Sequence, residues 1–456
     1  MKKLKTIILA AGYGKRMKSK LPKVLHKVSG VSMIQHVVDL AKEIGSDQVI
    51  CVVGHGRELV EEDLKGQSVE FVVQAQQLGT GHAVKMADAY LDDGEILVLF
   101  GDAPLMSHAS LQAFISHHRD GGYHASLIST LFEDPTGYGR IIRDEKGQFE
   151  KIVEHKDATD QERLVKEINS GIGLFDAKLL RNALNALKND NQQGEYYLTD
   201  VFEVIKNQGG NISAYVTPDH YEVMGVNDRL ALAEAELYHQ NRIKRYWMLE
   251  GVTMIMPESI YIEKNVKIGQ DTLLQPGTRL RGKTVIGEDC EIGPDADIAD
   301  THIANGVSIK YSVVTKSVID DKATIGPFAY LRPKSNIGKS VKIGDFVEVK
   351  NSTIEEGSKV SHLTYVGDGH VGKNVNLGCG VVFVNYDGKN KHLTVVEDNA
   401  FVGCNTNLIA PVKVGKDAYI AAGSTITEDV PEGALAIARE RQVNKTDWSN
   451  KYQKDK

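Results

Sequence analysis

Aliphatic side chains recur at intervals of six residues, with a few slips, between positions 262 and 430, and this spacing restricts the possible fold more than any other feature. The expected inward positions are Ile262, Ile268, Leu274, Leu280, Ile286, Ile292, Ile298, Ile303, Ile309, Val313, Ile319, Ile325, Leu331, Ile337, Ile343, Val349, Ile354, Val360, Val366, Val371, Leu377, Phe383, Val396, Val402, Leu408, Val414, Ile420 and Ile426. An α-helix would scatter these residues around its circumference, because it has about 3.6 residues per turn. One short strand and one tight turn per hexad would stack them in columns instead. The pattern therefore predicts a parallel β-helix.

The position four residues after each aliphatic residue favours small side chains, as at Thr272, Thr278 and Ala296. We expect this position to point inward as well. Its side chain must then be small, because space near the axis of a narrow coil is limited. Repeats of this kind resemble those of the left-handed β-helix acyltransferases, which place three hexads in each triangular coil. The resemblance implies a left-handed β-helix in which about twenty-eight hexads form roughly nine coils, each rising ~4.8 Å.

Residues 5–227 alternate strand-like and helix-like segments, which predicts a mostly parallel sheet covered on both faces, with ligands at the carboxyl ends of its strands. The expected strands cover residues 6–10, 48–53, 69–74, 95–100, 125–131 and 171–175, and the expected helices include 33–44, 81–91 and 110–118. A linker helix is expected over residues 228–250, with Leu230, Ala233, Leu237 and Ile243 on its apolar stripe. The predicted domains are therefore 1–227, the linker 228–250, and 251–456.

The first expected strand ends in small residues, and two cationic residues follow it. These residues are Leu9, Ala10, Ala11, Gly12, Arg16 and Lys23. Small residues let backbone N–H groups approach phosphate oxygens, and the two cations add positive charge. The Gly-x-Gly of residues 12–14 alone marks only a tight turn, and it matches neither a Walker loop nor the dinucleotide fingerprint. The complete string, with its Leu-Pro-Lys at residues 21–23, resembles the Rossmann-like sugar-phosphate nucleotidyltransferases.

That resemblance implies roles for further residues at strand ends and loops. It assigns Gln74, Gly79 and Thr80 to the pyrimidine base, Phe100, Gly101 and Asp102 to the nucleotide site, and Gly139, Glu154 and Asn169 to the sugar. Asp102 and Asn227 would hold Mg²⁺, a cation that prefers oxygen ligands. Considered alone, Gln74 is a polar residue that ends a strand, and Asp102 or Asn227 could simply cap a helix. The family often has Tyr where this chain has Phe100.

The hexads are interrupted at residues 383–392, and an insertion of this kind can build a ligand-binding face. His362 stands two residues after the inward Val360, so we expect it near a corner of a coil. A single His is more often an ordinary surface residue. A functional role for His362 is nevertheless favoured, because six further residues match the same family pattern: Arg332, Lys350, Tyr365, Asn376, Asn385 and Tyr386.

Together the two halves resemble the bacterial bifunctional N-acetylglucosamine-1-phosphate uridyltransferases and glucosamine-1-phosphate acetyltransferases. The resemblance covers nearly the whole chain, through residues 421–424 and 436–439. It implies acetyl transfer from acetyl-CoA to glucosamine 1-phosphate, followed by uridylyl transfer from UTP to N-acetylglucosamine 1-phosphate with release of pyrophosphate. It also implies Mg²⁺ and a homotrimer whose acetyl sites lie between neighbouring β-helices.

Under this resemblance His362 is the general base of acetyl transfer, while Arg16 and Lys23 are the catalytic residues of uridylyl transfer. The residues implied to bind glucosamine 1-phosphate are Arg332, Lys350, Tyr365 and Asn376, and those implied to bind acetyl-CoA are Cys379, Asn385, Tyr386, Cys404, Ala422 and Arg439. The family commonly has Ala and Ser in place of the two cysteines, so backbone contacts are expected there. The competing mechanism is an acyl-enzyme in which one of these cysteines carries the acetyl group. Direct transfer within a ternary complex needs no such covalent intermediate.

Charge and cysteine content narrow the remaining possibilities. The net charge of −7 gives no reason to expect a nucleic acid or a membrane as partner, and no apolar run reaches transmembrane length. The four cysteines lack metal-ligand spacing, which indicates a reducing cytoplasm. Two rival functions are a nucleotidyltransferase whose β-helix only assembles subunits and a non-catalytic sensor of a UDP-sugar. His362 and the insertion argue against the first, and Arg16, Lys23 and Asp102 argue against the second.

Overall fold

The computed structural model describes residues 2–452 and divides the chain into two compact units, residues 1–241 and 242–456. The predicted long helix is present as α8 (Arg229–Leu249), and the division falls within it. The domain boundaries expected at residues 227 and 251 remain a prediction. Among the described residues, no helix has both the length and the apolar character needed to cross a lipid bilayer.

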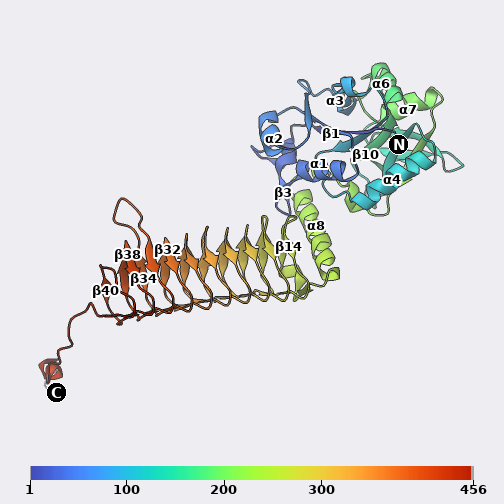
Figure 1. Ribbon diagram of the computed structural model, residues 1–456. Helices are drawn as coiled ribbons and strands as arrows, with labels where there is room; N and C mark the ends of the chain where they lie inside the picture. Colours follow the sequence, from blue (N-terminus) through green and yellow to red (C-terminus); the bar gives the residue numbers. More distant parts are fainter. Residues whose placement is uncertain (1, 453–456) are drawn as a thin grey trace. The chain divides into compact units, whose positions relative to one another are not determined.

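The first unit is built on a nine-stranded sheet with the order β11-β7-β10-β6-β1-β4-β5, to which β8 and β9 attach through β10 (Figure 1). Neighbouring strands are parallel except around β10, which runs antiparallel to β6, β7 and β8, and between β8 and β9. Each of the six predicted strands is present, whereas β8, β9 and β11 were not expected. The strands are β1 (Leu4–Ala10), β4 (Gln48–Val53), β5 (Glu70–Val73), β6 (Glu95–Phe100), β7 (Ala125–Leu131), β8 (Arg140–Arg143), β9 (Phe149–Val153), β10 (Glu167–Asp176) and β11 (Ile212–Val216), with a separate hairpin of β2 (Lys27–Val28) and β3 (Val31–Ser32).

Helices cover both faces of this sheet, as the alternating apolar residues of β1 require. Ile8 enters the core that holds Val37, Val60 and Phe114 of α1, α2 and α4, whereas Ile7 enters the core on the other face. The helices are α1 (Met33–Glu43), α2 (Arg57–Asp63), α3 (Thr80–Lys85), α4 (His108–Asp120), α5 (Asp160–Arg163), α6 (Ala177–Ala186) and α7 (Asp200–Asn207), with 3-10 turns at Lys15–Met17, Lys23–Leu25, Asp88–Tyr90 and His220–Val223. The helix expected over residues 81–91 is therefore shorter than predicted. It ends at Lys85, and a 3-10 turn follows.

The predicted apolar stripe of α8 is wrong for Leu230, Ala233 and Leu237, whereas Ile243 packs against the core of the β-helix as expected. Leu230 and Leu237 are exposed, while Ala235 and Lys244 are buried. A buried lysine is tolerated because its ammonium donates to the carbonyl oxygen of Pro257 at 2.9 Å, and burial lowers its pKa. The helix therefore buries a mixed polar and small face, which an apolar periodicity does not reveal.

The second unit is a parallel β-helix of three sheets, and the prediction of three hexads per coil is confirmed because each strand pairs with the strand three positions later (Figure 1). The eleven-stranded sheet contains β12 (Thr253–Met254), β15 (Leu273–Leu274), β18 (Glu291–Ile292), β21 (Ser308–Ile309), β24 (Thr324–Ile325), β27 (Lys342–Asp345), β30 (Lys359–His362), β33 (Asn376–Leu377), β36 (Phe401–Val402), β39 (Tyr419–Ile420) and β41 (Leu435–Ala436). The ten-stranded sheet contains β13 (Tyr261–Ile262), β16 (Arg279–Arg281), β19 (Asp297–Ala299), β22 (Val313–Thr315), β25 (Tyr330–Leu331), β28 (Glu348–Lys350), β31 (Tyr365–Gly367), β34 (Val382–Val384), β37 (Asn407–Ile409) and β40 (Thr425–Ile426). The nine-stranded sheet contains β14 (Lys267–Ile268), β17 (Val285–Ile286), β20 (His302–Ile303), β23 (Val318–Ile319), β26 (Asn336–Ile337), β29 (Thr353–Ile354), β32 (Gly369–Val371), β35 (Thr394–Val396) and β38 (Val412–Val414), and 3-10 turns lie at Pro257–Ser259 and Trp448–Tyr452.

The inward columns form one continuous core, and the expected small positions, such as Thr272 and Ala296, are fully buried. One inward position is predicted wrongly. Val314 is fully buried, whereas Val313 is 41% exposed. The strand register aligns Val314 with Ile298 and Leu331, so this corner is one residue shorter than a regular hexad.

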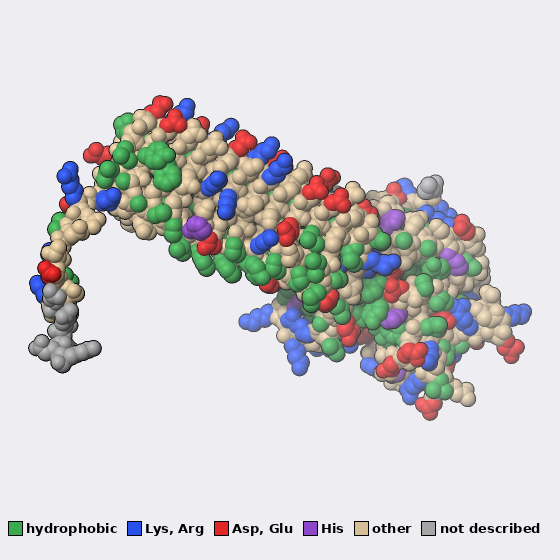
Figure 2. All heavy atoms as spheres, turned by 90° about the horizontal axis from the view of Figure 1, so that it is seen from below, with side chains coloured by type: hydrophobic (Ala, Val, Ile, Leu, Met, Phe, Trp, Pro, Cys, Tyr) green, Lys and Arg blue, Asp and Glu red, His purple; other side chains and the backbone are tan. Residues whose placement is uncertain are grey.

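An exposed apolar row runs along one corner of the β-helix, where Tyr311, Phe328, Phe346 and Leu363 follow one another on successive coils. The Phe328 ring lies 5.7 Å from that of Tyr311 and 5.4 Å from that of Phe346, measured between centroids. Figure 2 shows hydrophobic side chains gathered along one side of the β-helix. We call these four residues the corner row.

Candidate active sites

The carboxyl ends of β1, β5 and β6 surround a pocket of about 290 Å³ in the first unit. The structure brings ten of the predicted residues to its wall: Leu9, Ala10, Ala11, Gly12, Lys23, Gln74, Gly79, Thr80, Phe100 and Asp102. They meet because parallel strands end at the same edge of a sheet. Gln74 is buried, and its amide nitrogen donates to the Gly79 carbonyl oxygen at 3.2 Å.

A second pocket of about 200 Å³ shares Thr80 and Phe100 with the first. Gly139, Glu154 and Asn169 line this adjoining pocket. A Cβ atom on Gly139 would lie 3.4 Å from both carboxylate oxygens of Glu154, so glycine keeps the space in front of this carboxylate open. The expectation that a strand ends at Asn169 is wrong. This residue lies inside β10, where the register against β7 is interrupted.

The two predicted metal ligands converge on one ammonium group. Lys23 forms an ion pair with Asp102, and its Nζ donates to Asn227 Oδ1 at 3.1 Å. Neither Asp102 nor Asn227 caps a helix, because Ser107 caps α4 and Asp228 accepts from the first N–H groups of α8. The oxygens of Asp102 and Asn227 thus already contact one cation, the Lys23 ammonium, and oxygen donors of this kind also suit a hard divalent ion.

No group of three His, Cys, Asp or Glu residues able to hold a metal exists within residues 2–452. An ion bound by Asp102 and Asn227 would therefore need further oxygens from elsewhere. Substrate phosphates provide such oxygens, because Mg²⁺ is commonly bound by one or two protein groups together with phosphates. The donor set thus fits a metal that binds with its substrate.

Arg16, Gly101 and Asn227 are the predicted residues of this half that do not line either pocket. Arg16 is exposed in a 3-10 turn (Lys15–Met17) that begins after Gly14. Gly14 has φ +60°, and a Cβ atom there would lie 2.6 Å from Lys23 Cβ, so only glycine allows the turn to approach the lysine this closely.

Two carboxyl groups near the second pocket have raised pKa values. Burial raises the pKa of Glu154, although Thr199 Oγ1 donates to its Oε1 at 3.1 Å. Burial, and then the negative charge of Glu154, raise the pKa of Asp200 to about 6. Residues 195–200 escape prediction from the sequence, because their only signal is a pair of tyrosines between acidic residues.

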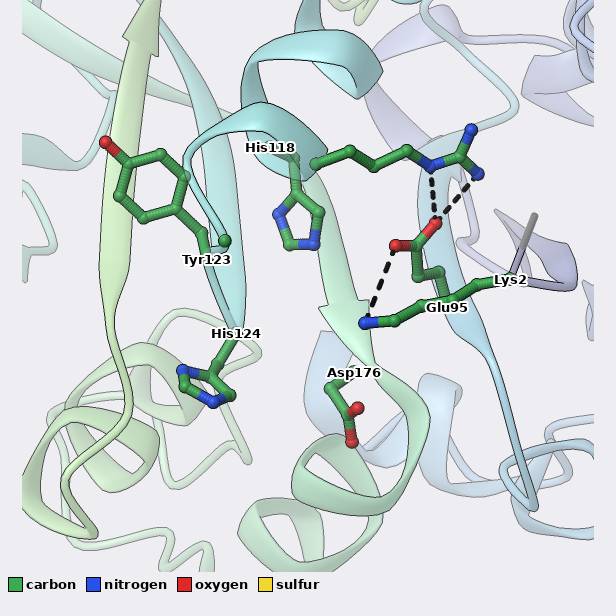
Figure 3. Close-up of a pocket in the computed structure, with 8 residues that line it drawn as sticks. Lys2, Glu95, His118, Tyr123, His124 and Asp176 are labelled. Atoms are coloured by element: carbon green, nitrogen blue, oxygen red, sulfur yellow. Dashed lines mark hydrogen bonds and ion pairs between the residues drawn. The ribbon is translucent and has the colours of Figure 1, made fainter.

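Another pocket of about 290 Å³ lies at the opposite edge of the sheet, where β1 and β6 begin (Figure 3). Glu95 is paired there with Arg119 at 2.8 Å and with Lys2 at 4.0 Å. Burial lowers the pKa of His118 to about 4, and its Nδ1 lies 2.8 Å from Ser126 Oγ. This pocket contains none of the predicted residues, so the candidate site stays at the carboxyl edge.

In the β-helix, His362 and Asp345 occupy equivalent corner positions of neighbouring coils. His362 Nδ1 lies 2.6 Å from Asp345 Oδ1, and this hydrogen bond lowers the pKa of the carboxyl group. The His362 side chain is 57% exposed, so a substrate can reach the ring. Asp345 escapes prediction from the sequence. Its only signal is the seventeen-residue separation, which equals one coil here.

Cationic groups gather in the middle of the ten-stranded sheet, at the carboxyl ends of β25 and β28. Arg332 and Lys350 follow the paired inward residues of β25 and β28, and Arg332 Nη1 donates to Glu348 Oε1 at 2.8 Å. The ammonium of Lys391 lies close enough to lower the pKa of Lys350. Tyr365 belongs to the same sheet. Lys391 is a further residue that the motif did not reveal.

Asn376 does not join this group, because it lies in β33 of the eleven-stranded sheet, on another face of the prism. Within one chain, the structure therefore brings Arg332, Lys350 and Tyr365 to one sheet and leaves Asn376 on a different one. A site that used all four residues would need two of the three sheets of the β-helix, which are the faces of a triangular prism.

The expected insertion is an ordered loop between β34 and β35. Tyr386 and Lys391 form a bridge across it, and Asp387 Oδ1 accepts from the backbone N–H groups of Lys389 and Asn390. Asn385 is buried and donates its amide to Asp368. Tyr386 remains exposed at the surface.

Four of the six predicted acetyl-CoA residues line up on one edge of the β-helix, whereas Asn385 and Tyr386 lie in the insertion loop. Register places Cys379, Cys404 and Ala422 at equivalent positions of successive coils, each two residues after an inward residue. His362 holds the same position one coil before Cys379. Arg439 follows on the last coil, and an added Cβ on Gly423 would lie 3.6 Å from its Cδ. A single column thus joins the predicted base to the predicted coenzyme contacts.

The fold and these two sites define a sugar-phosphate nucleotidyltransferase domain that is followed by a hexapeptide-repeat transferase domain. Three family models agree: a MobA-like NTP transferase domain over residues 6–172, a GMPPB C-terminal domain over 313–387 and a bacterial transferase hexapeptide (six repeats) over 393–428. A solved structure of UDP-glucose pyrophosphorylase complexed with UDP-glucose is more distantly similar, with a TM-score of 0.44 and 21% identity over 53% of this chain and 100% of that chain.

Full-length relatives are far more similar. The bifunctional protein GlmU of Caldanaerobacter subterraneus subsp. tengcongensis is 58% identical over 449 residues, covering 98% of both chains. Those of a Geobacillus species and of Clostridioides difficile are 56% and 53% identical, with at least 98% of each chain covered. The chain belongs to the GlmU family, and it is a bifunctional enzyme with uridyltransferase and acetyltransferase activities.

Proposed function

We propose that this enzyme makes UDP-N-acetylglucosamine in two steps on two separate sites. Residues 251–456 transfer the acetyl group of acetyl-CoA to glucosamine 1-phosphate. Residues 1–227 then join N-acetylglucosamine 1-phosphate to UTP and release pyrophosphate, and residues 228–250 link the two domains. The main support is that one chain carries two chemically unlike groups of residues. The first unit has adjoining pockets around Lys23 and Asp102, and the β-helix has an imidazole–carboxylate pair and a cluster of three cations.

Uridylyl transfer at the first site requires positioning and charge stabilisation more than covalent chemistry. A phosphate oxygen of the sugar attacks the α-phosphorus of UTP in line, and pyrophosphate leaves. Backbone N–H groups of residues 9–12, with Arg16 and Lys23, stabilise the charge that develops. Glu154 and Asn169 in the second pocket face the sugar hydroxyl and acetamido groups. Mg²⁺, held by Asp102 and Asn227 together with phosphates, supplies additional positive charge when bound.

Acetyl transfer at the second site begins from an ammonium group, which has no lone pair with which to attack a thioester. His362 accepts that proton through Nε2, because Nδ1–H donates to the Asp345 carboxylate and sets the tautomer. The free amine then attacks the thioester carbonyl carbon and the carbon–sulfur bond breaks. The nitrogen loses its second proton as the amide forms, and the departing coenzyme thiolate takes up a proton to leave as the thiol. Arg332, Lys350 and Lys391 hold the substrate phosphate as a cluster of cations.

A homotrimer would complete the acetyl site. The corner row supports this proposal, because Phe328 and Phe346 expose 55% and 57% of their surface to water and also have φ values of 60° and 57°. Bulky residues with positive φ are strained, and exposed apolar rows mark interfaces. The row reaches Leu363, the neighbour of His362. A second chain docked here would bring its own prism face, with Asn376, to this site.

Phe328→Glu tests this assembly, because a carboxylate in a buried apolar contact opposes association. Light scattering should report a monomer, acetyl transfer should fall, and uridylyl transfer should persist. Lys316→Glu on an exposed corner outside the row is the matched control. A trimeric Phe328→Glu protein would show that the row is not the interface.

We propose the cytoplasm as the site of action, because UTP and acetyl-CoA are cytoplasmic metabolites and all four cysteines are free thiols. No nucleic acid or membrane is expected as a partner. An assay that omits one component at a time tests the whole function. UDP-N-acetylglucosamine should form only when glucosamine 1-phosphate, acetyl-CoA, UTP and Mg²⁺ are all present. If N-acetylglucosamine 1-phosphate were used but glucosamine 1-phosphate were never acetylated, the β-helix would only assemble subunits.

A further inference from the structure

Cys379 and Cys404 lie on neighbouring coils at equivalent positions of the edge that leads from His362 to Arg439. Leu377 and Val402 are register partners two residues earlier. The Asn405 N–H donates to the Cys379 carbonyl oxygen at 2.7 Å, so the coils stay paired through the corner. Strands paired in this way lie ~4.8 Å apart, and a disulfide requires a Cα separation of about 4.4–6.8 Å. The expected spacing of these paired coils therefore falls within the range of Cα separations that a disulfide spans.

These two thiols are also the accessible ones. Cys404 is exposed and Cys379 is partly exposed, whereas Cys51 and Cys290 are buried. Burial raises the pKa of Cys51 to about 12 and also raises the pKa of Cys290, whose Sγ donates to the Ala304 carbonyl oxygen at 3.1 Å. Thiol reactions need an accessible thiolate. An oxidant should therefore select Cys379 and Cys404.

We propose that Cys379 and Cys404 form a reversible disulfide that stops acetyl transfer while uridylyl transfer continues. The inhibitory effect rests on the proposed function, because it requires this edge to be the acetyl-CoA site. A bridge there would tie together two coils in the column that also holds His362, and it would change the surface offered to the coenzyme.

The oxidant is a low-molecular-weight disulfide. The thiolate of one cysteine attacks one sulfur of this molecule, which forms a mixed disulfide and expels one small thiolate. The second cysteine thiolate then attacks the protein sulfur of the mixed disulfide and expels the other small thiolate. Two protein thiols become one disulfide, the small disulfide is reduced to two thiols, and the two protons of the cysteines pass to them.

The experiment treats the full-length enzyme with oxidised glutathione and follows mass, acetyl transfer and uridylyl transfer together. We expect a loss of two hydrogens located by peptide mapping to Cys379 and Cys404, with Cys51 and Cys290 still alkylatable. Acetyl transfer should fall at least ~10-fold and recover with dithiothreitol, and uridylyl transfer should not change. Desulfo-coenzyme A, which has no thiol, should slow the oxidation if the pair lies in the coenzyme site.

Cys379→Ala and Cys404→Ser are each compared with their own untreated sample, so their basal rates do not enter the result. Both variants should resist inactivation by bridging, and Cys290→Ala should remain as sensitive as the parent. A stable glutathione adduct on one cysteine without a bridge, or a bridge that leaves acetyl transfer unaffected, would overturn the proposal. If the untreated enzyme had no acetyltransferase activity, the proposed function would fail instead, and peptide mapping would still decide whether the pair closes.

Discussion

His362 and Asp345 are seventeen residues apart in the sequence but adjacent in space, with 2.6 Å between His362 Nδ1 and Asp345 Oδ1. One coil separates them, and the same corner position recurs on each coil. The carboxylate holds one ring nitrogen, which leaves the other free to take a proton from substrate. This pair explains how an exposed side chain can act as an oriented base.

Asp345→Asn should lower kcat for acetyl transfer by about 10-fold with little change in KM for glucosamine 1-phosphate, because the amide cannot orient the base equally well but does not touch the substrate. Asp345→Glu should recover part of the loss. Steady-state kinetics of both variants would check this. An equal loss in the Glu variant, or a change confined to KM, would contradict a positioning role.

His362→Ala should reduce acetyl transfer by ~10²–10⁴-fold, because the substrate ammonium then has no neighbouring base. Uridylyl transfer from N-acetylglucosamine 1-phosphate serves as the internal control and should stay at the parent rate. A His362→Ala enzyme that still acetylates at the normal rate would remove this residue from the mechanism and revive the cysteine acyl-enzyme.

Arg16→Ala should reduce uridylyl transfer by ~10²-fold or more, because we propose that the arginine stabilises charge on the phosphates in the transition state. Lys20→Ala, an exposed residue of the same loop, is the matched control and should have almost no effect. Both activities are measured on the same preparation. A folded Arg16→Ala protein that lost both activities would be incompatible with two separate sites.

Removal of divalent cations should separate the two activities. Chelation with EDTA should abolish uridylyl transfer, because Asp102 and Asn227 are expected to bind the ion only together with substrate phosphates. Acetyl transfer is proposed to use an imidazole base and no metal ion, so it should continue. Added Mg²⁺ should restore the first activity. An acetyl transfer that stopped on chelation would contradict a β-helix site that works without a metal ion.

Asp200→Asn should stabilise the enzyme at pH 8 more than at pH 5. An acid whose pKa is raised on folding, here from 3.8 to about 6, binds its proton more tightly in the folded state. The free energy of unfolding therefore decreases as the pH rises from 3.8 to about 6, where the carboxyl group loses its proton in the folded protein. Asn carries no titrating proton, so the variant does not show this decrease. We expect a gain of about 1 kcal/mol, or roughly 2–4 °C in Tm, at pH 8.

Thermal unfolding of the parent and of Asp200→Asn at both pH values checks this effect. Asp190→Asn is the control, because this residue is exposed on the neighbouring loop. A gain that was larger at pH 5 than at pH 8 would have the wrong sign and would exclude a buried, charged Asp200 as its cause.

The sequence by itself determined the architecture of both halves. Inward residues such as Leu274 and Ile292 are buried in the same way on successive coils. The sequence therefore repeats aliphatic residues at a fixed interval, and this interval predicts the β-helix. In the first half, residues 9–12 and Asp102 were expected to meet because each ends a strand of one parallel sheet. The first inference needs only the local periodicity. The second needs only the rule that the carboxyl ends of parallel strands lie at the same edge of the sheet.

Tertiary structure alone decided which side chains face one another across coils. Coil length varies at the corners and at the insertion, so Asp345 and His362 are seventeen residues apart whereas Cys379 and Cys404 are twenty-five apart. The shortened corner also moves the inward position to Val314. Register at such points is set by packing of the whole column and not by the residues on either side. The convergence of Asp102 and Asn227 on Lys23 is likewise a product of packing between distant segments.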